Sequence, residues 1–270
     1  MLVASLNANG IRAAARRGFP EWLARRNPDI LGVQEMRCPE AEIPDVFGGY
    51  HLSYHQGNLP GRNGVALATR KPPAAVRRGF GHDSDGEGRY IEVDLPGVTV
   101  ASLYLPKGDA PELGDAAKQR YDRKMDFMAA FAGYLPKAAA AAAGHGREFL
   151  VMGDFNIANT NADLKNWKAN QKASGFLPEE RDWFTALLAP GTVIDVVRAL
   201  HPEQPGPYSW WSWRGKAFDN DAGWRIDYQL ATPVLAAQAI AGGTDRDASY
   251  AARISDHAPV WVEYGLTPSP

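Results

Sequence analysis

The sequence lacks several features that would assign it to a class of protein at once. It has one cysteine, Cys38, among 270 residues, so no disulfide can form within the chain, which is typical of a reducing compartment. Its net charge of −2 gives no overall attraction to nucleic acid. No apolar run approaches the roughly 20 residues of a membrane span, and the opening "LVASLNANG" becomes polar too early for a signal peptide. We therefore expect a cytoplasmic protein without a membrane partner.

Several catalytic motifs are absent too. The six histidines are scattered, and with a single cysteine they do not suggest a tetrahedral zinc site. There is no GxSxG motif, and Ser255, Asp256 and His257 are consecutive, so they do not form a serine-hydrolase triad. Neither a Walker A motif nor GxGxxG occurs, so the usual phosphate-binding loops of nucleotide-dependent enzymes are missing.

What the sequence does contain is a series of short apolar runs separated by helical patterns. Residues 19–27 and 116–135 have helical patterns, and in the second, Tyr121, Met125, Met128 and Phe131 recur at core-facing spacing. The alanine-rich stretch that ends at Gly144 can extend that helix. Strands and helices that alternate predict α/β layers with mixed sheets. The predicted strands are 2–6, 30–34, 64–69, 90–95, 98–105, 148–152, 225–231 and 258–264.

No stretch has the composition of an interdomain linker, so residues 1–270 are expected to form a single domain. The last residues, 265–270, are expected to fray.

Polar side chains stand at the ends of many of these runs. The clearest case is "GDFN", residues 153–156, which follows the apolar run "EFLVM". A turn is the simple explanation, because Gly, Asp and Asn are turn residues wherever strands stop. Several polar strand ends together favour one functional rim instead, since functional residues often lie on loops at one edge of a sheet. The members of this set are Asn7, Glu35, Tyr104, Asp154, Asn156, Asp227, Asp256 and His257.

The composition of this set favours phosphodiester hydrolysis. Four carboxylates suggest a hard cation that prefers oxygen ligands, and Mg²⁺ fits because it is held by a few carboxylates and by substrate phosphates. A carboxylate can deprotonate water, and His257 can act on the phosphate if Asp227 holds its ring. The amides of Asn7 and Asn156 can donate to phosphate oxygens.

Five motifs then carry a resemblance: "SLNANGIRA", "LGVQE", "GDFN", "GWRIDY" and "SDHAP". Together they resemble the exonuclease III family of abasic-site endonucleases, in the endonuclease/exonuclease/phosphatase superfamily. The resemblance runs from Met1 to about Tyr264. It implies a DNase I-like, four-layered α/β sandwich, in which helices flank two mixed β-sheets. It also implies a Mg²⁺-dependent enzyme, for which Mn²⁺ substitutes, that cleaves DNA 5′ to abasic sites and cleans blocked 3′ ends.

The family's roles transfer to this sequence motif by motif. Glu35 resembles the principal metal ligand, with Asn7 and Asp256 nearby. Asp154 resembles the residue that activates water, Asn156 a phosphate contact, and Tyr104 a phosphate-stabilising tyrosine. His257 resembles the catalytic histidine that Asp227 supports. The resemblance further implies an abasic-sugar pocket of Trp210, Trp224 and Ile226, and a DNA-binding set of Arg12, Lys165, Lys168, Asn170, Lys172 and Arg225. It also implies a monomer that associates with the nucleoid through DNA.

Structural alternatives stay open for many of these residues. Asp256 could cap a turn, Tyr104 could pack in the core, and the three pocket residues could all be core. Trp210, Trp211 and Trp213 could be core or a sugar platform, and strand alternation would put Trp211 on one face and the other two on the opposite face. The basic clusters, which also include Arg16 and Arg17, could be ordinary solvated charges. The sequence does not decide whether Arg89 is structural or faces DNA.

Two positions depart from the family pattern. Asn9 stands where some relatives have Asp, and Ala173 stands where close relatives often have Asn. They leave open the balance between exonuclease and endonuclease activity.

Two competing functions remain. A lipid or inositol-phosphate phosphodiesterase on the same fold should lack the aromatic "GWRIDY" pocket and the basic clusters. A non-catalytic nucleic-acid-binding relative should have lost some of the catalytic residues, and all are present.

Overall fold

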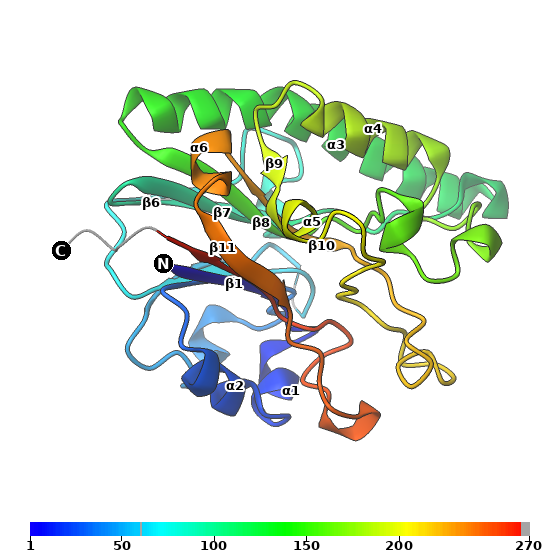
Figure 1. Cartoon of the computed structure of the whole chain (residues 1–270), viewed down its shortest axis with the longest axis horizontal. Helices are drawn as coiled ribbons and strands as arrows, with labels where there is room; N and C mark the ends of the chain where they lie inside the picture. Colours follow the sequence, from blue (N-terminus) through cyan, green and yellow to red (C-terminus); the bar gives the residue numbers. More distant parts are fainter. Residues whose placement is uncertain (60, 266–270) are drawn as a thin grey trace.

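The computed structural model describes residues 1–59 and 61–265. Two six-stranded sheets pack face to face, and helices cover both outer faces, as Figure 1 shows. This confirms the predicted four-layered sandwich with mixed sheets. The first sheet has the order β11-β12-β1-β2-β4-β3, and the second has the order β5-β6-β7-β8-β10-β9.

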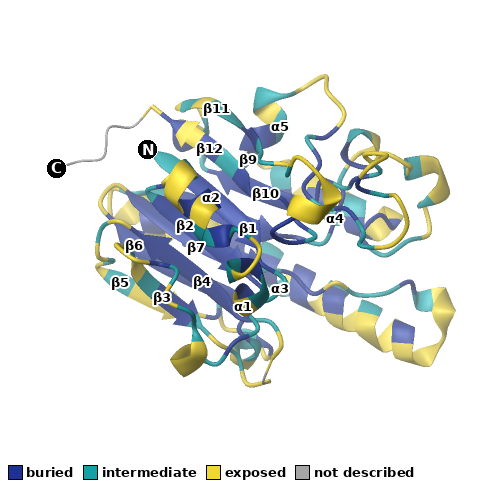
Figure 2. Cartoon of the chain, turned by 90° about the horizontal axis from the view of Figure 1, so that it is seen from below, coloured by how far each residue is buried: buried dark blue, intermediate teal, exposed yellow. Residues whose placement is uncertain are grey.

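Most strands have apolar, buried sequences because both faces of each sheet are covered (Figure 2). The first sheet consists of β1 (Leu2–Asn7), β2 (Ile30–Gln34), β3 (His51–His55), β4 (Val65–Thr69), β11 (Ala239–Thr244) and β12 (Val260–Tyr264). The second consists of β5 (Ala75–Arg78), β6 (Tyr90–Leu95), β7 (Val98–Tyr104), β8 (Glu148–Asp154), β9 (Ile194–Asp195) and β10 (Asp227–Ala231).

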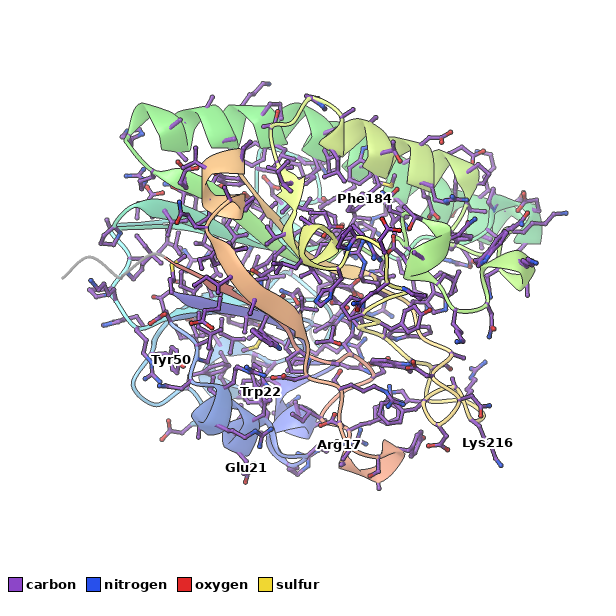
Figure 3. The ribbon with its side chains drawn as sticks, in the orientation of Figure 1. Arg17, Glu21, Trp22, Tyr50, Phe184 and Lys216 are labelled. Atoms are coloured by element: carbon purple, nitrogen blue, oxygen red, sulfur yellow. The ribbon has the colours of Figure 1, made fainter. Side chains whose placement is uncertain are left out.

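The helices lie on the two outer faces. α1 (Ile11–Ala15) and α2 (Phe19–Arg26) cover the first sheet. Trp22 points from α2 toward that sheet while Glu21 points into solvent (Figure 3). α3 (Asp115–Gly144) and α4 (Pro178–Leu188) cover the second sheet, where Phe184 packs 4.5 Å from Tyr228 between ring centroids. α5 (Val196–Leu200) and α6 (Pro233–Ala236) are short.

Strand pairing brings the polar strand ends together. β1 and β2 are parallel, with Asn7 opposite Gln34, so Asn7 and Glu35 leave the first sheet side by side. β7 and β8 are parallel, with Tyr104 opposite Asp154, and β10 is antiparallel to β8, with Asp227 also opposite Asp154. The ends of both sheets therefore meet at one edge of the sandwich, as a shared functional rim requires.

All eight predicted strands are present: 30–34 and 90–95 have the predicted bounds, and the other six have one end shifted. The strands β3, β5, β9 and β11 and the helices α1, α4, α5 and α6 were not predicted from the sequence. The strand β5, "AVRR", is an exposed edge strand without apolar alternation, and β11, "AIAGGT", contains two glycines, which are depleted in strands. The alanine run does extend α3, which continues past Pro136 to Gly144.

The buried face of α3 differs slightly from the prediction. Met128 and Phe131 are buried, but Tyr121 and Met125 are only half-buried, and Lys124 and Phe127 take the inner positions. Residues 266–270, most of the tail expected to fray, lie outside the described residues. In the described part of the chain, no helix combines the length and apolar character needed to cross a bilayer.

Candidate active site

A cavity of about 340 Å³ opens where the ends of the two sheets meet. The first sheet and its loops supply Glu35 and Asp256 to its wall, and the second supplies Tyr104 and Asp154. Of the predicted catalytic and metal residues, the two that do not line it are Asn7 and Asp227, which lie just behind it. The lining consists of Asn9, Glu35, Arg37, Tyr104, Lys107, Asp154, Asn156, Ala173, Ser174, Gly175, Trp210, Trp224, Ile226, Asp256 and His257.

The loop "GDFN" has the local geometry that the cavity needs. Gly153 has φ +139°, and a Cβ there would lie 2.0 Å from the Leu103 carbonyl oxygen, so no other residue fits between β7 and β8. Asn156 has φ +51°, and its backbone N–H donates to Asp154 Oδ1 at 2.8 Å. The Asn156 side-chain amide donates to the Leu105 carbonyl at 2.9 Å. The turn explanation is therefore correct, and the turn also fixes two cavity residues.

Asn7 connects the carboxylates of the two sheets. Its Nδ2 donates to Glu35 Oε1 and to Asp154 Oδ2, both at 2.8 Å, while its Oδ1 accepts the N–H of Asn9 at 3.0 Å. Two carboxylate acceptors fix the orientation of the amide, so its oxygen faces away from them. That Asn7 also ligates a metal stays a prediction. Asn7 is a bridge that holds Glu35 and Asp154 together.

His257 lies between two carboxylates. Its Nδ1 is 2.8 Å from Asp227 Oδ2, and its Nε2 is 3.8 Å from Asp154 Oδ2. Burial lowers the pKa of His257, but the charge and hydrogen bond of Asp227, with the charges of Asp154 and Asp256, outweigh burial and raise it to about 10. The buried Asp227 Oδ1 has no hydrogen-bond partner among the described residues. The ring is therefore positively charged at neutral pH.

At Asp154, unlike at His257, burial determines the direction of the pKa shift. Burial raises its pKa to about 7, and the nearby carboxylates of Asp227 and Glu35 act in the same direction, while His257 opposes them. A carboxyl group with a pKa near neutral pH can both accept and release a proton during a reaction. This combination of burial and charged neighbours is characteristic of functional sites.

Two alternative sets of residues at the cavity could hold a cation. Asp154, Asp227 and His257 offer ligand atoms within 4.8 Å of one another. A protonated imidazole cannot ligate a metal, so this trio fits proton transfer better. Glu35 and Asp256 are the alternative, and both are oxygen donors on the cavity wall. Asn7 and Arg37 donate to Glu35, and Asn9, Trp210 and Ser255 donate to Asp256. Each carboxylate has about four acceptor positions, so both keep capacity for a cation.

Asp256 is held in its ionised form. Burial raises its pKa, but the charge of His257 and hydrogen bonds from Trp210 Nε1 (3.1 Å) and Asn9 Nδ2 (2.8 Å) outweigh that and lower it. Asn9, one of the two departures from the family pattern, therefore supports Asp256 as a hydrogen-bond donor. The carboxylate oxygens of Glu35 and Asp256 are the kind of ligand that a hard divalent cation prefers.

Tyr104 lines the cavity and keeps its proton. Burial and the charges of Glu35 and Asp154 raise its pKa well above the ordinary value, so its hydroxyl is a neutral donor. Arg89 lies 5.0 Å from the centroid of this ring and pairs with Glu87 at 2.8 Å. Arg89 does not line the cavity. It packs against the Tyr104 ring and supports that side chain.

Trp210, Trp224 and Ile226 form one apolar side of the cavity. The two indole rings meet edge to face, with centroids 6.1 Å apart, and the three residues also pack on Leu164 and Phe176. They are therefore both packed and open to the cavity. Trp211 is 1% exposed and packs against Phe218, away from the cavity, but Trp213 does not line the cavity with Trp210, so strict alternation does not hold here.

The candidate DNA-binding residues fall into different environments. The side chains of Lys165, Lys168 and Lys172 are exposed, and no described residue forms an ion pair with them. Asn170 donates from its side chain to the Asn166 carbonyl at 2.9 Å. Arg12 is exposed and pairs with Glu42.

Arg225 does not face DNA, and the prediction for it is wrong. Its side chain is 2% exposed and pairs with Asp163 at 2.6 Å and with Asp195 at 2.8 Å. Burial lowers its pKa, but these two carboxylates outweigh burial and raise it, so it is a structural charge. Alternation along "WRID" explains this, because Trp224 and Ile226 face the cavity and Arg225 faces away.

Several residues that line the cavity were not among the predicted site residues. Lys107 lines the cavity and lies three residues after Tyr104, the last residue of β7. That closeness to a predicted site residue could have indicated it. Arg37 pairs with Glu35. Ser174 and Gly175 approach from a loop far along the chain, and no sequence pattern pointed to them.

Comparisons with known proteins agree with this geometry. The family model described as "Endonuclease/Exonuclease/phosphatase family" matches residues 4–257. The chain is 33% identical to exodeoxyribonuclease III from Haemophilus influenzae, over 96% of this chain and 98% of that protein.

Two solved structures are also similar. An AP endonuclease from Archaeoglobus fulgidus superposes with a TM-score of 0.86 at 28% identity, over 98% of this chain and 100% of that one. A variant of the 3′ phosphatase NExo from Neisseria, bound to a product DNA hairpin, also has a TM-score of 0.86 at 28% identity, over 98% and 99% of the two chains. This chain belongs to the endonuclease/exonuclease/phosphatase family, in the branch that contains exodeoxyribonuclease III and the AP endonucleases.

Proposed function

We propose that this protein is a metal-dependent DNA repair phosphodiesterase that cleaves the backbone 5′ to abasic sites and removes blocking groups from 3′ ends. One observation carries the proposal. A buried Asp154, a charged His257 and the oxygen ligands Glu35 and Asp256 surround one cavity whose other side is apolar. The names of the relatives, an exodeoxyribonuclease, an AP endonuclease and a 3′ phosphatase, support the same activities.

Each cavity residue has a chemical task in this proposal. Asp154 accepts the proton of the attacking water, because its pKa of about 7 makes it a usable base at neutral pH. His257 stays protonated and stabilises negative charge on the phosphate, with Asp227 fixing its ring. Tyr104 and Asn156 donate hydrogen bonds to phosphate oxygens.

A divalent cation, when bound, would supply positive charge to neutralise phosphate oxygens and the leaving alkoxide. Glu35 and Asp256 would hold it, and we propose Mg²⁺, with Mn²⁺ as a substitute, because the ligands are carboxylate oxygens. Protein donors already orient both carboxylates, so the site needs little rearrangement to accept the ion.

The apolar side of the cavity supports recognition of a missing base. An abasic sugar is turned out of the helix at lower cost than a paired nucleotide, and it can lie against Trp210, Trp224 and Ile226. Lys165, Lys168 and Lys172 would contact the backbone of the same duplex.

We further propose a monomer of one domain that acts in the cytoplasm on nucleoid DNA. The intact catalytic set argues against a non-catalytic binding role. A lipid or inositol-phosphate phosphodiesterase is disfavoured by the largely apolar aromatic wall, which suits a polyol ring poorly.

The test uses three 5′-labelled DNA duplexes: one with an abasic site, one intact, and one with a nick that ends in a 3′-phosphate. With Mg²⁺, the first should be cut on the 5′ side of the lesion and the third dephosphorylated, while the intact duplex survives. With chelator, none should react. Cutting of intact and abasic duplexes at equal rates would contradict the proposed specificity.

A further inference from the structure

Lys124 is a fully buried ammonium group close to the cavity. It lies on the inner face of α3 with 0% exposure, and its Nζ donates three hydrogen bonds. The acceptors are Glu180 Oε1 at 2.6 Å, the Asn156 carbonyl at 2.9 Å and the Lys107 carbonyl at 3.2 Å. These use every N–H of the ammonium, so the buried charge is fully satisfied.

The two carbonyls belong to the loops that form the cavity wall. Lys107 follows β7 and Asn156 follows β8, and both residues line the cavity. The Lys107 carbonyl also accepts from Ser174 Oγ at 2.8 Å. Gly108 packs against the lysine stem, because a Cβ there would lie 2.6 Å from Lys124 Cδ. The position of both loops therefore depends on Lys124.

Glu180 extends the same arrangement to a third loop. It is also 0% exposed, and its Oε2 accepts the backbone N–H groups of Gly175 at 2.6 Å and Leu177 at 3.0 Å. Gly175 lines the cavity next to Ser174. One ion pair thus connects three loops that are separated in sequence and meet on the same side of the cavity.

Stability alone does not explain this ion pair. Its neighbours on α3, Phe127, Met128 and Phe131, are apolar, and a well-packed apolar pair is often as stable as a buried ion pair. What apolar side chains cannot do is hold the two loop carbonyls. Asn156 has a left-handed backbone with φ +51°, and its N–H bonds to Asp154, so a shift of its carbonyl is transmitted to the catalytic carboxylate.

We propose that Lys124, with Glu180, is a positioning residue that holds the Lys107, Asn156 and Gly175 loops in their catalytic arrangement without touching substrate. The proposal rests on the proposed function of this cavity in phosphodiester hydrolysis. Because a displacement of about 1 Å can cost a hundredfold in rate, loss of the pair reduces turnover, while the exposed lysines that bind DNA are unaffected.

The main variant removes both charges together, as Lys124→Met with Glu180→Gln. The glutamine keeps an oxygen for the Gly175 and Leu177 N–H groups, and no unpaired charge is left buried. Lys118→Met is the matched control, because Lys118 is exposed on the same helix and pairs with Asp122, away from the cavity wall. Thermal midpoint, Kd for an abasic duplex in chelator, and single-turnover rate in Mg²⁺ are measured for each.

The double variant should stay folded at the assay temperature, bind the duplex within about threefold of the wild type, and cleave about a hundredfold more slowly. Lys118→Met should match the wild type in all three measurements. A wild-type rate in the folded double variant would overturn the proposal, as would a rate that falls only in proportion to the unfolded fraction.

If the double variant does not fold, Glu180→Gln alone serves, since it keeps the size of the side chain and an oxygen for the Gly175 and Leu177 N–H groups but removes the acceptor for Lys124. It should lower the rate about tenfold at unchanged Kd. An unchanged rate in that variant would also overturn the proposal.

Parallel assays use bis(p-nitrophenyl) phosphate, a diester without an abasic sugar. They separate this proposal from the proposed function. A wild-type enzyme that hydrolyses this diester but not abasic DNA disproves the substrate assignment, and the effect of the Lys124 variants on diester hydrolysis still decides the positioning role.

Discussion

The carboxylates on the two sides of the cavity have different neighbours. On the first-sheet side, hydrogen-bond donors surround Glu35 and Asp256, and the pKa of Asp256 is lowered. On the second-sheet side, Asp154 also accepts hydrogen bonds, from Asn7 and Asn156. Burial, with the charges of Asp227 and Glu35, outweighs these and His257 and raises the pKa of Asp154 to about 7. Donors keep an acid ionised and ready for a cation, whereas burial beside like charges prepares an acid to exchange a proton. We infer that the fold divides cation binding and proton transfer between its two sheets.

The largest expected effect comes from the cation side. Chelation should abolish cleavage of an abasic duplex, and Mg²⁺ or Mn²⁺ should restore it, because the carboxylates alone repel phosphate. Glu35→Ala should raise the metal concentration that gives half the maximal rate and lower the rate heavily. Metal titrations of wild type and variant measure this. Full activity in chelator would contradict the proposal that Glu35 and Asp256 bind a cation needed for cleavage.

On the proton-transfer side, His257→Ala should cut the single-turnover rate by about a hundredfold or more while folding and duplex binding persist. The metal dependence of this variant should match that of the wild type, because His257 supports charge on the phosphate and does not hold the ion. A shifted metal titration would show that the two sides are not separate in function.

The apolar wall of Trp210, Trp224 and Ile226 should affect the choice of substrate more than the rate of cleavage. Trp224→Ala is expected to reduce the preference for an abasic over an intact duplex, while removal of a 3′-phosphate, which needs less of the wall, suffers less. Both activities and the thermal midpoint are measured. If the residue serves only the core, stability falls by about 3–5 kcal/mol and both activities fall equally.

The smallest effect is expected from the exposed lysines. Lys168→Ala with Lys172→Ala should weaken duplex binding and reduce the slope of log affinity against log salt by up to about 2, one for each lost phosphate contact. The cleavage rate of bound DNA should not change. An unchanged slope would place both lysines away from the DNA.

Much of this site was predictable from the ends of strands. Asn7, Glu35, Tyr104 and Asp154 follow apolar runs, and parallel pairing of β1 with β2 and of β7 with β8 places such ends together. The wall residues Trp224 and Ile226 were predictable from alternation. These signals are local, and a single sequence contains them.

Other features depend on partners distant in sequence. Arg225 looked like a DNA contact because Asp163 and Asp195, which neutralise it, lie 62 and 30 residues away. The bridging role of Asn7 was not predictable, because the sequence does not show which carboxylates an amide contacts. Lys124 lies one position from the predicted inner face of α3, and its acceptors come from three other segments.

The most direct test of the central claim, that Asp154 is the base of a metal-dependent phosphodiesterase, is single-turnover cleavage of an abasic duplex in saturating Mg²⁺ by wild type and Asp154→Asn. Asn keeps the size of the side chain and removes its basicity. Cleavage 5′ to the lesion should slow by at least about a hundredfold, with duplex Kd unchanged or tighter because a negative charge is lost. Equal rates in the two proteins would contradict the account.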